Sequence, residues 1–358
     1  MICISKNNHS KNEEGPMKDI SVLGIDIAKL SFHVVGMDCR GKVILSKRLY
    51  RSELESFVSS LSPMLIGMES CASSHYWARV FKRYGHEVKL MAAQFVKPYV
   101  KSNKNDKVDA EAIAEGVNRP TMRFVPIKNI EQQDIQSLHR VRERLIKSRT
   151  ALINEMRGLL GEYGIILPKG RSKFRRELIE CLEKAGEKLT AMGRELFFNL
   201  YEEFIEMEKR VSLYERKLEA IFNAHPECQR LDTIPGIGYL SATALIAAVG
   251  NMSYFKNGRE FAAWLGLVPR QYSTGGKPRL GRISKRGDVY LRKLLVHGAR
   301  SCLHRLDGKM DRRSVWANKL KERNGANKAA VALANKTARI VWAILSRQEN
   351  YQTFALAA

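Results

Sequence analysis

The sequence lacks long apolar segments and clustered cysteines. No uninterrupted apolar run approaches the roughly 20 residues that a membrane-spanning helix needs. The opening residues, MICISKNNHSKNEEGPMKD, have no apolar core of the secretory signal type. The six cysteines, at positions 3, 39, 71, 181, 228 and 302, form no CxxC pair, so we expect buried small residues of a reducing compartment. These absences predict a cytoplasmic protein with no membrane partner.

Acidic residues are scarce relative to basic ones. The 358 residues include 61 Lys and Arg but only 37 Asp and Glu, giving a formal net charge of +24. Such a surface attracts polyanions; nucleic acid is the leading candidate partner, and an anionic membrane surface is the alternative. A hydrophobic content of 44% excludes general disorder. The length suffices for two or three domains, each with its own core.

The segment 19–128 alternates between strand-like and helix-like patterns. Three short β-rich runs, ISVLGIDIA, SFHVVGMD and KVILSKRLY, are followed by a helix at 52–60 and a strand at 64–69. A helix at 74–84, a strand at 86–92, helices within 94–117 and a strand at 121–127 complete the predicted unit. This order indicates a mixed α/β sheet of the ribonuclease H kind. Residues 1–18 are polar and predicted to be flexible, and 349–358 are predicted to form a tail.

The segment 129–225 has apolar residues at helical spacing, which predicts a helical hairpin. They form a first series and a second, heptad-like one: Ile135, Leu138, Val141, Leu145, Leu152, Met156 and Leu159, then Leu196, Leu200, Phe204, Met207, Val211, Tyr214, Leu218 and Ile221. A basic stretch, 168–176, lies between them. Two interpretations remain open. The hairpin packs on its own protein, or it forms a coiled-coil arm that dimerises while the basic stretch touches nucleic acid.

Four carboxylates occupy positions suited to a metal site. Asp26 closes the first strand and Glu69 closes the fourth, and in this topology those strands are parallel neighbours. Asp106 and Asp109 lie three residues apart on a predicted helix, which places them on one face. Converging carboxylates repel one another without cations. Two Mg²⁺ ions about 4 Å apart would neutralise them and promote an in-line phosphoryl displacement.

Each acidic residue also has a structural interpretation. An Asp after a strand is often a turn former, and Glu69 could be an ordinary surface residue. Asp106 could cap a helix, with Asp109 adding favourable charge near its N-terminus. The strand order and the basic chain together favour the metal interpretation.

The segment 226–348 is predicted to be an entirely helical domain. Within it, Ile234-Pro-Gly-Ile-Gly238 at the start of a helix is typical of a helix-hairpin-helix turn. Gly236 and Gly238 would let backbone N–H groups approach a DNA phosphate. An ordinary connection between helices is the alternative.

A basic, glycine-rich segment carries two candidate nucleophiles. Ser273 and Thr274 precede Gly275-Gly276, and residues 270–300 hold nine basic residues against one acidic residue, Asp288. A hydroxyl on such a flexible cationic loop could attack a scissile phosphate. A plain basic loop that holds DNA is the alternative. The candidate nucleic-acid contacts are Arg270, Lys277, Arg279, Arg282, Lys285, Arg286 and Arg292.

Five motifs, taken in their order along the chain, resemble those of a known family. They are GIDIAK, the Glu69 strand, NDKVDA, IPGIG and STGGK…GRISKRGD…LR. The family is that of the insertion-sequence transposases guided by a bridge RNA, which include the pilin-gene DNA invertases. The resemblance covers about residues 19–347. It implies a RuvC-like domain whose Asp26, Glu69, Asp106 and Asp109 bind Mg²⁺. It also implies a C-terminal domain whose serine forms a covalent link to DNA.

The resemblance also implies the partners. They are donor and target double-stranded DNA, a structured guide RNA, and further copies of the chain in a homodimer or homotetramer. In one respect the sequence departs from the family pattern, because Thr274 occupies the usual serine position before the glycine. Ser273 is favoured as the nucleophile because a primary hydroxyl is less crowded, and Thr274 stays the alternative.

Two other classes of function fit parts of the sequence. A structure-selective nuclease would use the acidic cluster with water as the nucleophile and would form no covalent adduct. A non-catalytic nucleic-acid binder would use the acidic residues only structurally.

Overall fold

The computed structural model describes residues 19–100, 105–306 and 308–352. Contacts divide the chain into two compact units, Met1–Asn129 and Ile130–Ala358. None of the helices described is long and apolar enough to cross a membrane.

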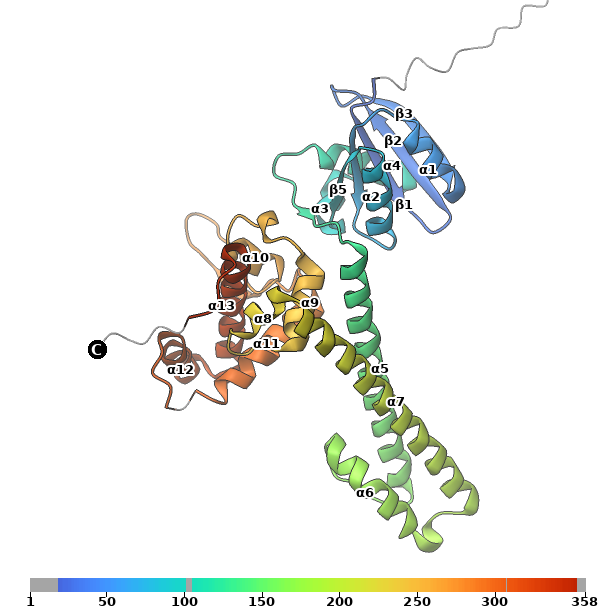
Figure 1. Cartoon of the computed structure of the whole chain (residues 1–358), viewed down its shortest axis with the longest axis vertical. Coiled ribbons are helices and arrows are strands. Elements are labelled where there is room, and N and C mark those ends of the chain that lie inside the picture. The colour runs from blue at the N-terminus through green and yellow to red at the C-terminus, as the bar shows by residue number, and fades with distance from the viewer. Residues whose placement is uncertain (1–18, 101–104, 307, 353–358) are drawn as a thin grey trace, which may run out of the picture. The chain divides into compact units, whose positions relative to one another are not determined.

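The N-terminal unit contains a six-stranded mixed sheet in the order β3-β2-β1-β4-β5-β6 (Figure 1). The strands are β1 (Val22–Ile27), β2 (Ser31–Met37), β3 (Val43–Tyr50), β4 (Leu65–Glu69), β5 (Glu87–Met91) and β6 (Phe124–Val125). The central strands β1, β4 and β5 are parallel, whereas β2, β3 and β6 are antiparallel to their neighbours. The predicted mixed sheet is confirmed. The last strand is shorter than the predicted 121–127, and at its C-terminal end Pro126 has no N–H to extend the ladder.

Helices cover both faces of the sheet, and each face has its own core. They are α1 (Arg51–Ser59), α2 (Ser74–Arg83), α3 (Ala93–Val96), the 3₁₀ turn η2 (Lys97–Tyr99) and α4 (Asp106–Val117). Leu23 and Ile25 of β1 belong to the core that includes Leu54 of α1 and Phe81 of α2. Val22 belongs to the opposite core, with α4. The alternation of β1 residues between two cores is the two-residue period of a strand.

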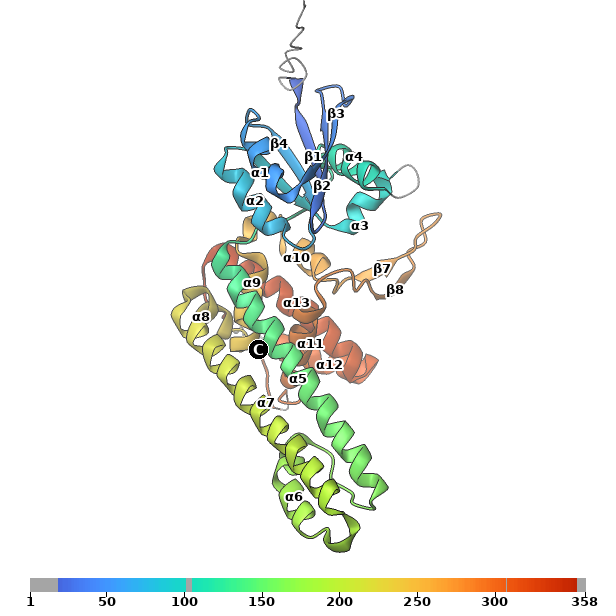
Figure 2. The same cartoon turned by 90° about the vertical axis from the view of Figure 1, so that its right-hand side faces the viewer.

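Two long helices, α5 (Ile130–Glu162) and α7 (Ala191–Ala224), lie side by side in the second unit (Figures 1 and 2). The chain between them forms α6 (Arg171–Glu183) and the 3₁₀ turn η3 (Gly186–Lys188). The basic stretch 168–176 therefore runs into α6, where Phe174 is fully buried. Leu159 and Leu196, expected among the packed residues, are 40% and 46% exposed.

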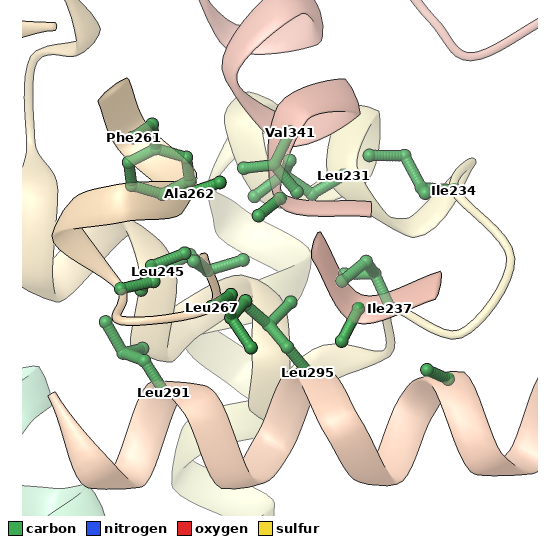
Figure 3. Packing of buried hydrophobic residues seen from close by; sticks show 14 of the residues in the cluster. Leu231, Ile234, Ile237, Leu245, Phe261, Ala262, Leu267, Leu291, Leu295 and Val341 are labelled. Atoms are coloured by element: carbon green, nitrogen blue, oxygen red, sulfur yellow. The ribbon is translucent and has the colours of Figure 1, made fainter. Parts of the chain in front are cut away.

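The remaining helices of this unit surround a second large apolar core, part of which Figure 3 shows. They are α8 (Pro226–Asp232), α9 (Tyr239–Val249), η4 (Met252–Tyr254), α10 (Gly258–Trp264), α11 (Val289–Leu303), α12 (Arg312–Asn324) and α13 (Ala326–Arg347). The expectation of an entirely helical region was wrong. A two-stranded antiparallel ribbon, β7 (Pro269–Gln271) and β8 (Leu280–Ile283), is inserted between α10 and α11.

The prediction that the cysteines are buried holds only in part. Cys228 is buried, whereas Cys39 and Cys71 are exposed, and the cysteines in the described part of the chain are free thiols. The predicted flexible segment 1–18, with Cys3, lies outside the described residues. Of the predicted tail, 353–358 lies outside them too, while the backbone N–H of Tyr351 donates to Thr233 Oγ1 at 2.9 Å.

Candidate active site and nucleic-acid interface

Asp26 and Glu69 come from neighbouring parallel strands in matched register. Gly24 pairs with Gly67 and Ile25 pairs with Met68, so the next residue on each strand is the carboxylate. Both side chains therefore emerge at the same end of the sheet, as the sequence predicted.

Two glycines show which face of the sheet these carboxylates occupy. A Cβ added to Gly24 would lie 2.3 Å from the Ala110 carbonyl oxygen, and one added to Gly67 would lie 2.8 Å from Val117 Cβ. Helix α4 therefore crosses β1 and β4 in direct contact with both backbones. Side chains two residues apart on a strand share a face. Asp26 and Glu69 thus project from the face that carries α4.

The other two acidic residues lie in the first turn of α4. The helix cap is Asn105, whose Oδ1 accepts a hydrogen bond from the Val108 N–H at 2.9 Å. Asp106 is therefore not the cap. It precedes the sheet-facing Ala110 by four residues, and Asp109 likewise precedes Ile113, which shares a core with β1. Residues four apart share a helix face, so both aspartates lie on the sheet side of α4.

The acidic residues affect the pKa values of two neighbouring titratable groups. Cys71 is exposed as a residue, but partial desolvation of its thiol, together with the carboxylates Glu69 and Asp26, raises the pKa of that thiol to about 11. Burial lowers the pKa of His33 below its ordinary value, against the opposing effect of Asp106. His33 is the strand partner of Asp26 across β1 and β2 and also feels the charge of Asp106, so it lies near both the strand acid and the helix acid.

The donor chemistry of this acidic site suits a hard divalent cation, since carboxylate oxygens are preferred ligands of Mg²⁺. Among the described residues, however, no three His, Cys, Asp or Glu side chains lie close enough together to hold a metal ion. The backbone thus gathers the four acidic residues on one face, although no three of the described acidic side chains are grouped closely enough for a metal ion.

The segment with the hydroxyl candidates is a β-hairpin and not the flexible loop expected. Thr274 and Lys277 form a bridge, with the Lys277 N–H donating to the Thr274 carbonyl at 3.1 Å. Gly275 and Gly276 between them have φ angles of 56° and 74°. A two-residue hairpin turn of this kind needs positive φ at both positions, which glycine adopts without strain. Figure 2 shows the ribbon projecting from the helices of its unit.

Both hydroxyl candidates lie at the exposed tip of this hairpin. All residues from 271 to 280 are exposed. Ser273 Oγ accepts a hydrogen bond from Gln271 Nε2 at 2.8 Å, while Thr274 contributes its backbone to the turn. The exposed basic side chains around them are those of Arg270, Lys277, Arg279, Arg282, Lys285 and Arg286. This surface can bind an extended polyanion.

Arg292 differs from the other predicted contacts. Its side chain is only 9% exposed, and Nη1 donates to the carbonyls of Leu265 at 3.0 Å and Gly287 at 3.2 Å. A guanidinium committed to buried carbonyls holds the end of α10 against the start of α11. The prediction that Arg292 contacts nucleic acid at the surface was therefore wrong, and its role is structural.

The two glycines of the Ile234–Gly238 turn have different surroundings. Gly236 has a φ of 90°, and a Cβ there would lie 2.7 Å from Cys302 Sγ, so this glycine permits close packing on α11. Gly238 is the N-cap residue of α9, and a Cβ there would meet nothing within 4 Å. Of the two, only Gly238 has open space beside its backbone.

Sequence reasoning missed His33 next to the acidic residues. The signal was available, because antiparallel pairing of the first two strands sets His33 opposite Asp26. It also missed the buried His139, whose Nδ1 lies 2.9 Å from the Tyr290 hydroxyl and whose Nε2 lies 3.0 Å from Thr243 Oγ1. No sequence pattern indicates those long-range partners.

Family models match both segments that contain the candidate site residues. A transposase domain of the IS110 DEDD type matches residues 23–165, which include all four acidic residues. A domain described as "Transposase IS116/IS110/IS902 family" matches residues 228–314, which include the hairpin. The chain is 47% identical over 342 residues to the transposase for insertion sequence element IS1111A of Coxiella burnetii, covering 96% of this chain and 94% of that protein. This chain belongs to the IS116/IS110/IS902 family of transposases.

Other relatives match over similar lengths. A probable family 20 transposase of Pseudomonas aeruginosa is 49% identical over 93% of this chain and 99% of its own. The transposase for insertion sequence element IS1328 of Yersinia enterocolitica is 40% identical over 92% of this chain and 98% of its own. As a transposase, the protein is an enzyme that cleaves and rejoins DNA.

Proposed function

We propose that this insertion-sequence transposase cuts DNA at the acidic site and carries the cut strand on the hairpin hydroxyl of Ser273. The observation that carries the proposal is the shared face of Asp26, Glu69, Asp106 and Asp109, set by the β1–β4 register and the glycine contacts with α4. These four carboxylates would hold Mg²⁺, and four carboxylate ligands are enough for two ions. Bound Mg²⁺ would supply charge neutralisation and Lewis acidity at the scissile phosphate.

The proposed covalent step balances without an outside energy source. Ser273 gives up its hydroxyl proton to a base, and its Oγ forms a bond to phosphorus. The bond between phosphorus and the leaving sugar oxygen breaks, and that oxygen takes a proton. The phosphoserine link keeps the energy of the phosphodiester, so a second sugar hydroxyl can reverse the step and rejoin the strand. The cationic residues of the hairpin would stabilise the charge that develops on the phosphate.

Ser273 is preferred to Thr274 for two reasons. Its primary hydroxyl is less crowded, and it accepts a hydrogen bond from the side chain of Gln271. Thr274 takes part in the turn through its backbone. Thr274 is the alternative nucleophile, and the two are separated by single substitutions.

The nucleic acids proposed as partners are donor and target double-stranded DNA and a guide RNA. The net charge of +24 and the exposed hairpin cations support binding to several polyanions. Gly238 at the open N-terminus of α9 is a candidate phosphate contact in a helix-hairpin-helix arrangement. A homodimer or homotetramer, formed through the long α5–α7 hairpin, would bring two DNA sites together.

Trapping a covalent adduct tests the proposed nucleophile. The full chain is incubated with Mg²⁺ and a nicked, labelled DNA carrying element ends, then separated under denaturing conditions. We expect a labelled protein band that disappears in Ser273→Ala and persists in Thr274→Ala. The reverse pattern would assign the nucleophile to Thr274.

A second candidate is a RuvC-like reaction in which water attacks the phosphate. The acidic site favours it, because all four carboxylates lie within one compact unit and need no hydroxyl from elsewhere in the chain. Under this alternative the DNA is cut with full Mg²⁺ dependence, no adduct forms, and Ser273→Ala and Thr274→Ala both cleave at the wild-type rate. Ribonuclease treatment of the protein would separately test the guide RNA. Cleavage should be lost if it depends on that RNA.

A further inference from the structure

A groove in the C-terminal unit combines an apolar floor with an exposed aromatic ring. It lies between the base of the hairpin, α12 and α13, and has a volume of about 990 Å³. Leu267, Ile283, Val331 and Ala332 line it, and the side of α12 contributes Trp316, which is 37% exposed. This volume is at the upper end of the ~300–1,000 Å³ typical of ligand pockets.

The rim of this groove is cationic. Arg282 of the hairpin and Lys328, Lys336 and Arg339 of α13 line it, and none of the described residues lining it is acidic. In the described part of the chain, none of these four cations forms an ion pair. The charge at the rim is therefore available to an anionic ligand.

Lys336 connects the rim with the aromatic ring. Its Nζ lies 4.4 Å from the centre of the Trp316 ring, a cation–π contact. Burial lowers the pKa of Lys336 below its ordinary value, and the nearby Arg313 and Arg339 lower it further. An anion placed at the rim would relieve this crowding of like charges.

We infer that this groove binds an unpaired strand of nucleic acid, with a base on the apolar floor beside Trp316 and its phosphates on the four cations. A single strand offers both an apolar base face and a regularly spaced negative charge. A duplex hides its base faces in the stack, so it could use the rim but not the floor. DNA and RNA single strands share this chemistry. None of the groove's lining residues belongs to the acidic site, and the binding needs neither metal ions nor Ser273.

Binding of labelled oligonucleotides tests the inference directly. Fluorescence anisotropy is measured on the full chain in EDTA, with a single-stranded DNA of about 12 nucleotides, the same sequence as RNA, and a blunt DNA duplex. We expect Trp316→Ala to weaken single-strand binding on the order of tenfold. Lys336→Gln should weaken it several-fold, while duplex binding changes less than twofold.

Matched variants control for the loss of an aromatic ring and of a charge. Tyr254, 52% exposed, lies in the same unit outside the groove, and Lys319 is an exposed lysine of α12 outside it. Tyr254→Ala and Lys319→Gln should bind single strands like the wild type. The inference fails if Trp316→Ala matches Tyr254→Ala, or if it weakens duplex and single-strand binding equally. The relative losses for DNA and RNA identify which strand the groove prefers.

A second measurement tests the same inference if Trp316→Ala does not fold. Titration of the wild type with the single strand should quench tryptophan fluorescence, and Trp316→Phe, which keeps an aromatic ring, should lose that quenching while retaining binding. Quenching that survives in Trp316→Phe would place the base elsewhere and overturn the inference.

Discussion

The sheet unit and the helical unit carry their candidate catalytic groups on different scaffolds. In the sheet unit, Asp26 and Glu69 follow directly from a paired strand register above a buried core. In the helical unit, Ser273 and Thr274 lie at the tip of a ribbon whose residues 271–280 are all exposed. A two-stranded ribbon without a covering layer has little stability of its own. Packing therefore fixes the acidic residues, whereas the positions of the hydroxyls depend on a short turn and on what the ribbon binds.

The largest effect is expected from removing one acidic residue of the sheet unit. Asp26→Asn should lower the rate of DNA cleavage by about three orders of magnitude or more, because losing one ligand of a two-metal site removes several kcal/mol of transition-state stabilisation. DNA binding, which depends on cations elsewhere, should persist. The measurement is cleavage of labelled DNA beside a binding isotherm.

A matched aspartate supplies the control. Asp38 Oδ1 accepts hydrogen bonds from the backbone N–H groups of Arg40 and Lys42 in an exposed turn of the same unit. Asp38→Asn should cleave at close to the wild-type rate. Equal cleavage by Asp26→Asn and Asp38→Asn would rule out the acidic site.

Glycine contacts allow the two units to be compared in stability. A Cβ at Gly24 would lie 2.3 Å from the Ala110 carbonyl, and one at Gly298 would lie 1.9 Å from the Gly236 carbonyl. Gly24→Ala and Gly298→Ala should each lower the free energy of unfolding by about 1–3 kcal/mol or more through overpacking. Only Gly24→Ala, which moves α4, should also reduce the increase in melting temperature that Mg²⁺ produces.

A glycine in open space provides the reference for these substitutions. Gly158 lies within α5, and a Cβ there would meet nothing within 4 Å. Gly158→Ala should raise the free energy of unfolding by about 0.5–1 kcal/mol, as expected for a helix interior. Chemical denaturation of the three variants checks the prediction, and a stable Gly298→Ala would contradict the tight packing of α11.

A buried histidine makes the stability of the helical unit depend on pH. Burial and the nearby Arg142 lower the pKa of His139 from 6.5 to about 4. Thr243 Oγ1 donates to the Tyr239 carbonyl at 2.6 Å, so His139 Nε2 donates to Thr243 and Nδ1 accepts from Tyr290. The unfolded chain takes up the proton more readily than the folded chain. The contribution of neutral His139 to the free energy of unfolding is therefore fully present above about pH 6.5. It decreases as the pH falls toward 4, by up to about 1.4 kcal/mol per pH unit.

The variant His139→Gln tests that dependence. It should remove this component of the slope between pH 6.5 and 4, although it also lowers stability at neutral pH. The measurement is the free energy of unfolding at several pH values. An unchanged slope would show that other groups cause the acid sensitivity.

The smallest effect is expected on the ribbon itself. Arg279→Gln should weaken DNA binding a few-fold and reduce the slope of log K against log salt by about 0.9, the loss of one phosphate contact. Its melting temperature should not change, because Arg279 is exposed.

The buried Arg292 gives the opposite expectation. Arg292→Gln should lower stability by about 1–3 kcal/mol through unsatisfied carbonyls and leave the salt slope of the folded protein unchanged.

The strand pattern and the motif order already predicted most of the N-terminal unit. Alternation within GIDIAK and the Glu69 strand is a local signal, and parallel pairing of the first and fourth strands follows from the element order. The Gly275-Gly276 pair also had a local meaning, since two glycines between β-prone residues favour a tight turn. The ribbon was nevertheless missed, because its strands are short, exposed and rich in basic residues, without the apolar alternation that marks a buried strand.

The sequence by itself determined the basic charge and the mixed sheet and named the four candidate acidic residues, because these depend on composition and on short-range periodicity. Only the tertiary structure decided that Arg292 is buried, that Asn105 caps α4 in place of Asp106, and that His139 lies between Tyr290 and Thr243. It also decided that Trp316 shares a groove with the base of the hairpin. Burial and long-range contacts depend on which distant segments pack together, and no local spacing in the chain encodes that choice.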